Sequence, residues 1–297
     1  MTDTDIIKFI DFLKNQKNYS KLTVDSYLSD LKIFKKYIKN TNKINPHDIQ
    51  LFISNQHKIG KNSKTIQRML SSIRTFFNFK IQMEELDANP AIDLIIPKSG
   101  KHLPNTVNSF EIDKLLDFKP KTALDERDKA IMELFYSSGL RLSELSSLTL
   151  AQLDLSSALI KVTGKGNKQR IVPVGKYAIQ SLKKWLLSRT QYEKKSMDEK
   201  TKQKLFLSQK GTPLSNRGIQ LRLEYWAKKC NLSHKLHPHM LRHSFAVDML
   251  TESGNLRAVQ SLLGHSNLST TQIYTQLDFS HLAKVYYNAH PRSTKKS

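Results

Sequence analysis

Cysteine is almost absent from this chain, because its 297 residues contain a single one, Cys230. One cysteine cannot form an internal disulfide, and it offers no cysteine cluster for zinc. No apolar run approaches the roughly 18 residues that a membrane span needs, and the first residues lack the apolar segment of a secretion signal. We therefore expect a cytoplasmic protein that has no structural metal and does not insert into a membrane.

Acidic residues are scarce relative to basic ones. The chain has 26 Asp and Glu against 48 Lys and Arg, which gives a formal net charge of +22. Such a charge predicts a polyanionic partner. The basic residues are interleaved with regularly spaced apolar ones, so a folded protein with a basic surface is expected. Because no helix pairs a Trp/Phe/Leu-rich face with a face of lysines alone, nucleic acid is favoured over lipid.

The first 88 residues show apolar positions at helical spacing throughout and predict a helical domain. One stripe contains Ile6, Ile7, Ile10 and Leu13, and a longer one begins at Leu22. The helix expected from Ser63 to Phe79 has an inward face made by Ile66, Leu70, Ile73, Phe76 and Phe77. Its other face carries Lys64, Arg68 and Arg74, which we interpret as DNA-binding residues. A merely solvated face is the alternative.

Residues 89–105 contain three prolines, a glycine and basic residues, and we interpret them as a linker to a second domain, residues 106–297. That domain is predominantly helical in pattern. Two β-rich runs, Leu159–Val162 and Arg170–Val174, flank a glycine-containing turn and predict a hairpin with Lys165 at its tip. The expected fold is therefore mainly α with a small β-hairpin, in two domains.

An acidic group, Asp125, Glu126 and Asp128, could suggest a metal site. These carboxylates fall at the start of a predicted helix, where they complement the helix dipole. No further ligand group at suitable spacing accompanies them. A structural role is the favoured interpretation.

The turn around Arg141 is the first candidate for chemistry. Gly139 is expected to end one helix and the residues after Arg141 to begin the next, which leaves the guanidinium free to point into a cleft. Glu144 lies one helical turn further on and is placed to orient Arg141.

The stretch from Leu236 to Tyr274 concentrates further candidates. Pro238 suits the first position of a helix, so His239 and Arg242 should share a face near a helix N-terminus. That helix is expected to end at Gly254.

A second helix, Leu256–Leu263, is closed by Gly264 and followed directly by His265. Residues 269–271 supply capping side chains for a third helix that carries Tyr274. Three short helices can thus bring two histidines, an arginine and a tyrosine together, a set of side chains suited to phosphate chemistry. Each of these residues taken alone is more often structural or solvated.

In order and spacing these motifs resemble the tyrosine site-specific recombinases. The resemblance rests on the motifs Ser138–Leu145, Gly164–Gly166, His239–His243, Leu262–His265 and Tyr274, together with the helical first domain. It implies that Arg141 and Arg242 bind the scissile phosphate and that Tyr274 is the nucleophile. Lys165 would protonate the leaving 5′ oxygen, and His239 and His265 would support the reaction. The segment Gly264–Arg292 resembles in particular the bacterial recombinases that resolve chromosome dimers.

The family chemistry implies a 3′-phosphotyrosyl intermediate, a Holliday junction and double-stranded DNA as partner, with neither ATP nor a metal ion, so no cofactor is expected. A tetramer on DNA is implied, formed by this chain alone or with a second recombinase, and held by an interlocking C-terminal segment. A mobile-element integrase and a type IB topoisomerase-like strand transferase are the enzymatic alternatives. A non-catalytic basic DNA-binding protein is the alternative from another class.

Overall fold

The computed structural model describes residues 1–38, 44–95, 107–164, 169–264 and 276–293, of which residues 276–281 are described by their backbone alone. The chain divides into two compact units, residues 1–102 and 103–297. Ala91 is fully buried in the core of the first unit, and its carbonyl accepts a hydrogen bond of 2.8 Å from Arg74 Nε. The first unit therefore extends past residue 88, into the segment that the sequence predicts as a linker.

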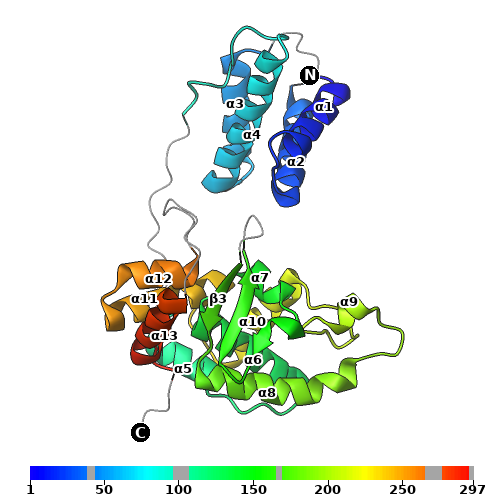
Figure 1. Cartoon of the computed structure of the whole chain (residues 1–297). Helices are drawn as coiled ribbons and strands as arrows, with labels where there is room; N and C mark the ends of the chain where they lie inside the picture. Colours follow the sequence, from blue (N-terminus) through cyan, green and yellow to red (C-terminus); the bar gives the residue numbers. More distant parts are fainter. Residues whose placement is uncertain (39–43, 96–106, 165–168, 265–275, 294–297) are drawn as a thin grey trace. The chain divides into compact units, whose positions relative to one another are not determined.

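The first unit is a group of helices (Figure 1). They pack around an aromatic core. Its helices are α1 (Asp3–Asn15), α2 (Lys21–Tyr37), α3 (Pro46–Lys58) and α4 (Ser63–Gln82). A polar side chain caps the N-terminus of each helix by accepting a backbone N–H bond. The core contains Phe9, Phe34, Phe52 and Phe76, and the rings of Phe9 and Phe76 meet edge to face at 5.4 Å.

The inward face predicted for α4 is confirmed, because all five of its apolar residues are buried. The stripe predicted for α1 is wrong at one position: Ile6 and Ile10 are buried, whereas Ile7 is 61% exposed. Successive residues of an α-helix point about 100° apart, so a residue directly after a core residue often falls outside the buried stripe. Leu22, at the start of α2, is also exposed, whereas Val24, two residues further on, is buried.

The second unit is predominantly helical with a small antiparallel sheet, which confirms the predicted fold class. Its helices are α5 (Ser109–Leu116), α6 (Ala123–Ser138), α7 (Leu142–Ser147), α8 (Lys176–Arg189), α9 (Glu199–Lys202), α10 (Asn216–Lys229), α11 (Pro238–Ser253), α12 (Leu256–Leu263) and α13 (Gln276–Ala289). The strands are β1 (Leu153–Asp154), β2 (Leu159–Thr163) and β3 (Gln169–Pro173), which pair in the order β1-β2-β3. Short 3-10 turns span Leu150–Gln152 and Thr190–Tyr192.

Helix α6 is buried along most of its length, and α8 and α11 pack against it. Its acidic first turns are structural. The Asp128 carboxylate accepts bonds from Arg127 (2.7 Å), Arg222 (2.5 Å) and the Trp226 indole (2.9 Å). These bonds tie α6 to α10 and agree with the structural interpretation of the acidic group.

Strands β2 and β3 form the predicted hairpin. Lys161 lies opposite Ile171 in the register, and Val162 and Val172 are buried against the core. The tip of the hairpin, with Lys165, lies outside the described residues.

The C-terminal segment packs against the helices of its own chain. Tyr286 of α13 is fully buried, and its hydroxyl lies 3.0 Å from the Ser137 hydroxyl of α6. Further on, Arg292 forms a buried ion pair of 2.8 Å with Glu133, also on α6. The docking of this segment on a neighbouring subunit stays a prediction. Over the described part of the chain, no helix is long and apolar enough to cross a bilayer.

Candidate active site

The turn between α6 and α7 positions Arg141. Helix α6 ends at Gly139, which adopts a left-handed conformation with φ 55°. A Cβ atom at this residue would lie 2.5 Å from Cδ1 of Phe245, on α11, so glycine is needed for the close approach as well as for the backbone angle. The chain reverses here, and Arg141 becomes the residue that precedes the first turn of α7.

Glu144 holds Arg141 from one turn along α7, as the sequence predicts. Its carboxylate accepts 2.8 Å bonds from the Arg141 guanidinium and from the Arg141 backbone N–H. Arg170 donates two more bonds to the same carboxylate, of 2.8 and 2.9 Å. Burial alone would raise the pKa of Glu144, but the bonds from the two arginines outweigh it and lower the pKa to about 2.

Arg242 lies on α11 and is 8% exposed. Its guanidinium donates to the carbonyl of Gly139 and, at 2.7 Å, to the carbonyl of Leu263. Burial and the positive charge of nearby Arg141 lower the pKa of Arg242 to about 10. A buried guanidinium with a second positive charge beside it forms a site that an anion would stabilise.

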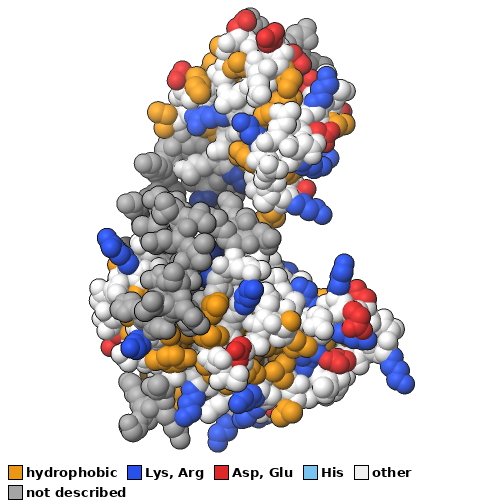
Figure 2. Space-filling view, viewed as in Figure 1, with side chains coloured by type: hydrophobic (Ala, Val, Ile, Leu, Met, Phe, Trp, Pro, Cys, Tyr) orange, Lys and Arg blue, Asp and Glu red, His pale blue; other side chains and the backbone are white. Residues whose placement is uncertain are grey.

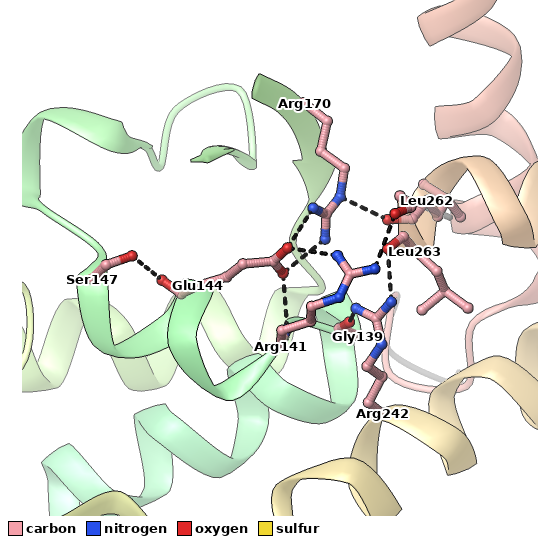
Figure 3. A network of polar contacts seen from close by, with 9 residues as sticks. Gly139, Arg141, Glu144, Ser147, Arg170, Arg242, Leu262 and Leu263 are labelled. Atoms are coloured by element: carbon pink, nitrogen blue, oxygen red, sulfur yellow. Dashed lines mark hydrogen bonds and ion pairs between the residues drawn. The ribbon is translucent and has the colours of Figure 1, made fainter. Parts of the chain in front are cut away.

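Arg141 and Arg242 meet at the C-terminal end of α12 (Figure 3). Arg141 donates a 3.0 Å bond to the carbonyl of Gly264, the residue after the one whose carbonyl Arg242 binds. About one third of the Arg141 side chain remains exposed, so solvent or a ligand can reach it. The structure thus brings together the two arginines that the sequence places 101 positions apart.

Of the other four predicted catalytic residues, the structure describes one, His239. His239 is exposed in the first turn of α11, one helical turn before Arg242. Lys165, His265 and Tyr274 lie outside the described residues. His265 directly follows Gly264 in the sequence, whose carbonyl Arg141 binds.

The three predicted DNA-binding residues of α4 also differ from one another. Lys64 is exposed. Arg68 donates a 2.5 Å bond to the buried carboxylate of Asp30, which joins α4 to α2. Arg74 donates to the carbonyl of Ala91 and to that of Leu94. The guanidiniums of Arg68 and Arg74 therefore have partners within the protein. Lys64 is exposed, so its side chain is the best placed of the three for the predicted contact with DNA.

Basic side chains are not confined to α4. Figure 2 shows Lys and Arg side chains scattered over the visible face of each unit, among polar and apolar ones. This distribution agrees with the spread of basic residues along the sequence.

Arg170 is a residue of this site that the sequence reasoning missed. It lies on β3, and the register places it opposite Val162, whose side chain is buried. A signal was available, since strand alternation puts Arg170 on the same face as buried Val172. A charged residue on the buried face of a strand needs a partner, and here that partner is Glu144.

Comparison with known proteins identifies the family of the chain. Residues 105–281 match the phage integrase family, and residues 6–84 match the N-terminal SAM-like domain of phage integrases. The tyrosine recombinase XerC of Mannheimia succiniciproducens is 44% identical over 99% of each chain, and that of Haemophilus influenzae strain Rd is 42% identical over 99% of each chain.

Solved structures show the same architecture. XerH recombinase bound to its difH substrate is 25% identical, with a TM-score of 0.66, over 95% of this chain and 83% of the other. The Tn1549 transposon integrase in complex with transposon DNA is 20% identical, with a TM-score of 0.71, over 94% of this chain and 99% of the other, and shows the fold alone. The resemblance to the tyrosine recombinases found in the sequence is confirmed, and both relatives named above are XerC recombinases. The chain belongs to the phage integrase family and is a tyrosine recombinase, an enzyme that transfers DNA strands.

Proposed function

We propose that this recombinase cuts and rejoins double-stranded DNA at a dif-like site and so resolves chromosome dimers. Relatives named XerC, 42–44% identical over nearly the whole chain, support the assignment. The observation that carries the chemistry is the meeting of Arg141 and Arg242 beside the end of α12. Their proximity creates a compact positive site beside the carbonyls of Leu263 and Gly264.

The two arginines bind the scissile phosphate in this proposal. A pentacoordinate transition state gathers negative charge on its non-bridging oxygens, and planar guanidiniums donate to two oxygens at a fixed geometry. The charge of the phosphate would also offset the burial and the positive charge of Arg141 that together lower the pKa of Arg242. Binding therefore strengthens as negative charge develops, which is the requirement for catalysis.

Tyr274 is the proposed nucleophile. Its oxygen attacks the phosphorus, the bond to the 5′ oxygen breaks, and a 3′-phosphotyrosyl ester forms. An ordinary tyrosine has a pKa of about 10, so the attack needs a proton acceptor, for which His239 is the candidate. Lys165 would donate a proton to the leaving 5′ oxygen, and His265 would donate a hydrogen bond to a non-bridging oxygen.

The ester conserves the free energy of the broken bond. A 5′ hydroxyl of another strand can therefore attack it and restore the DNA backbone without ATP. Two successive exchanges of this kind pass through a Holliday junction. We propose a tetramer on DNA for this purpose, formed with a XerD-like recombinase or by this chain alone.

The first prediction concerns Tyr274→Phe. A nicked suicide duplex that carries the recombination site of the source chromosome is incubated with the full chain, and covalent protein–DNA adducts are separated on a denaturing gel. Wild type should form an adduct, alone or after addition of the XerD-like partner, and Tyr274→Phe should form none at equal DNA binding. Loss of a single hydroxyl removes the nucleophile without removing a charge that binds DNA.

Two other outcomes would overturn the proposal. An adduct formed by Tyr274→Phe would exclude Tyr274 as the nucleophile. DNA binding without an adduct for wild type, with and without the partner, would favour a non-catalytic binding protein. A two-site assay then separates recombination from topoisomerase-like nicking, because only a recombinase exchanges the flanking arms.

A further inference from the structure

Arg170 makes more contacts inside the candidate site than its place on a short strand would suggest. Its side chain is 10% exposed. Two of its nitrogens donate to the two oxygens of Glu144, at 2.8 and 2.9 Å, and the third, Nε, donates at 3.1 Å to the carbonyl of Leu262 (Figure 3). Each nitrogen of the guanidinium thus already has a protein partner.

The contact with Leu262 belongs to a series. Arg170, Arg242 and Arg141 bind the carbonyls of three consecutive residues at the end of α12, as follows: Arg170 binds Leu262, Arg242 binds Leu263, and Arg141 binds Gly264. The last carbonyls of a helix have no partner within it and form the negative end of its dipole. Cations are stabilised there, so the end of α12 gathers the three arginines in one place.

Gly264 brings this helix end close to Arg170. It caps α12 in the left-handed conformation, with φ 64°. A Cβ atom there would lie only 3.1 Å from Cδ of Arg170. The Arg170 side chain therefore packs directly against the cap of α12 while it holds Glu144 on its other side.

Glu144 is the second contact of Arg170 in the site, after the end of α12. Its carboxylate is buried and accepts bonds from both Arg170 and Arg141. A carboxylate held by a bidentate arginine has one preferred orientation. Without Arg170, it would keep Arg141 as its partner but would lose the contact that fixes its plane.

We propose that Arg170 is a positioning residue for the two phosphate-binding arginines, acting through Glu144 on Arg141 and through the end of α12 on Arg242. The inference rests on the proposed function, because it assigns a role in that same reaction. Arg170 uses all three of its guanidinium nitrogens to hold Glu144 and Leu262, so we assign it to positioning and not to the phosphate. It is bound to α7 and α12 from a strand of the hairpin that carries Lys165, so it links the hairpin to the arginines.

The test is a single-turnover measurement on the suicide duplex described above, with protein in excess. Arg170→Ala should lower the rate constant of adduct formation by about 100-fold, the cost expected when catalytic groups are displaced by about 1 Å. DNA affinity should change by less than about threefold, because many phosphate contacts share the binding. The rate constant is read from protein already bound to DNA, so a variant that is partly unfolded but still saturates the duplex gives the rate constant of its folded fraction.

Two further variants separate positioning from general stability. Arg170→Lys keeps the charge but cannot bind both carboxylate oxygens, so its rate should remain well below wild type. Arg189→Ala is the matched control, because Arg189 is also buried and donates to backbone carbonyls of Lys204 and Leu205, away from the candidate site. It should lower the thermal midpoint and leave the rate constant of the bound protein near wild type.

A double-mutant cycle tests the route through Glu144. If Arg170 acts through this carboxylate, Arg170→Ala combined with Glu144→Gln should be scarcely slower than the slower single variant. Full multiplication of the two effects would overturn that route. A rate constant for Arg170→Ala equal to wild type would overturn the inference and leave the proposed function intact. No adduct with wild type, with and without the XerD-like partner, would overturn the proposed function itself.

Discussion

His290 is a buried histidine whose two ring nitrogens both have partners. Nε2 donates a 3.1 Å bond to the carbonyl of Tyr136, and Nδ1 accepts one of 3.1 Å from the backbone N–H of Arg292. The ring stacks on Tyr286. Burial lowers the pKa of His290 to about 4; the bond to Tyr136 opposes this shift, and the charge of Arg292 adds to it. A proton on Nδ1 would break the bond from Arg292, so the neutral ring belongs to the folded state.

This arrangement predicts a loss of stability in mild acid. Between pH 6.5, the ordinary pKa, and pH 4, the unfolded chain binds a proton that the folded chain does not, so unfolding becomes easier as the pH falls. The full shift corresponds to about 3 kcal/mol. Urea unfolding at pH 7 and pH 5 should show a smaller pH effect for His290→Gln than for wild type. Equal pH effects in the two proteins would contradict the assignment.

The pH range over which His290 affects stability differs from that of the acidic side chains. Bonds from Arg170 and Arg141 outweigh burial and lower the pKa of Glu144 to about 2, below its ordinary 4.5. The stability that Glu144 contributes is therefore lost only as the pH falls from about 4.5 towards 2. A decline of stability that begins near pH 6.5 and disappears in His290→Gln can thus be separated from acid denaturation of the carboxylates.

At the scale of elements, two helix ends offer a matched comparison. Gly139 ends α6 and Gly254 ends α11, with φ values of 55° and 62°. A Cβ at Gly139 would overlap Phe245, and a Cβ at Gly254 would have nothing within 4 Å. Both ends require the left-handed backbone, but only the first is also packed tightly.

We expect Gly254→Ala to cost about 1 kcal/mol of unfolding free energy, from the backbone angle alone. Gly139→Ala should cost about 2 to 5 kcal/mol, because overpacking against Phe245 adds to the same backbone term. Gly139→Ala should also slow adduct formation, since the Gly139 carbonyl receives Arg242. Chemical denaturation of both variants measures the difference. Equal costs would show that α6 and α11 separate readily at this contact.

Local signals in the sequence account for much of this architecture. Pro238 and Gly254 predict the start and end of α11, and Gly264 predicts the end of α12. The turn at Gly139 is also a local feature. So is the orientation of Arg141 by Glu144, because the two residues lie three positions apart in the sequence.

The parts that could not be predicted depend on contacts between distant segments. The site role of Arg170 arises because β3 brings it against both α7 and α12, 26 and 92 positions away along the chain. Likewise, Arg68 looks like a free cation on an exposed helix face until α2 supplies the buried carboxylate of Asp30. A periodicity argument locates the face of a helix and leaves open which side chains find a partner across the fold.

For the whole molecule, the net charge of +22 is the dominant property. Each phosphate that a protein neutralises releases a counterion, so the affinity for DNA falls as salt rises. Arg68 and Arg74 are held by protein partners, whereas Lys64 projects from the N-terminal end of the same helix. Lys64 is therefore the residue of α4 through which the predicted DNA contact can be measured.

We expect the affinity for a labelled duplex to fall by about 10³-fold or more between about 50 and 200 mM salt, as for an interface with many phosphate contacts. Lys64→Ala should reduce the slope of log affinity against log salt by about 1, because one phosphate contact is lost. Lys8→Ala is the control, since Lys8 is exposed on α1 of the same unit and is not among the predicted contacts. Fluorescence anisotropy over a salt series gives both slopes. A salt-insensitive complex would contradict a phosphate-dominated interface, and equal slopes for Lys64→Ala and wild type would remove α4 from it.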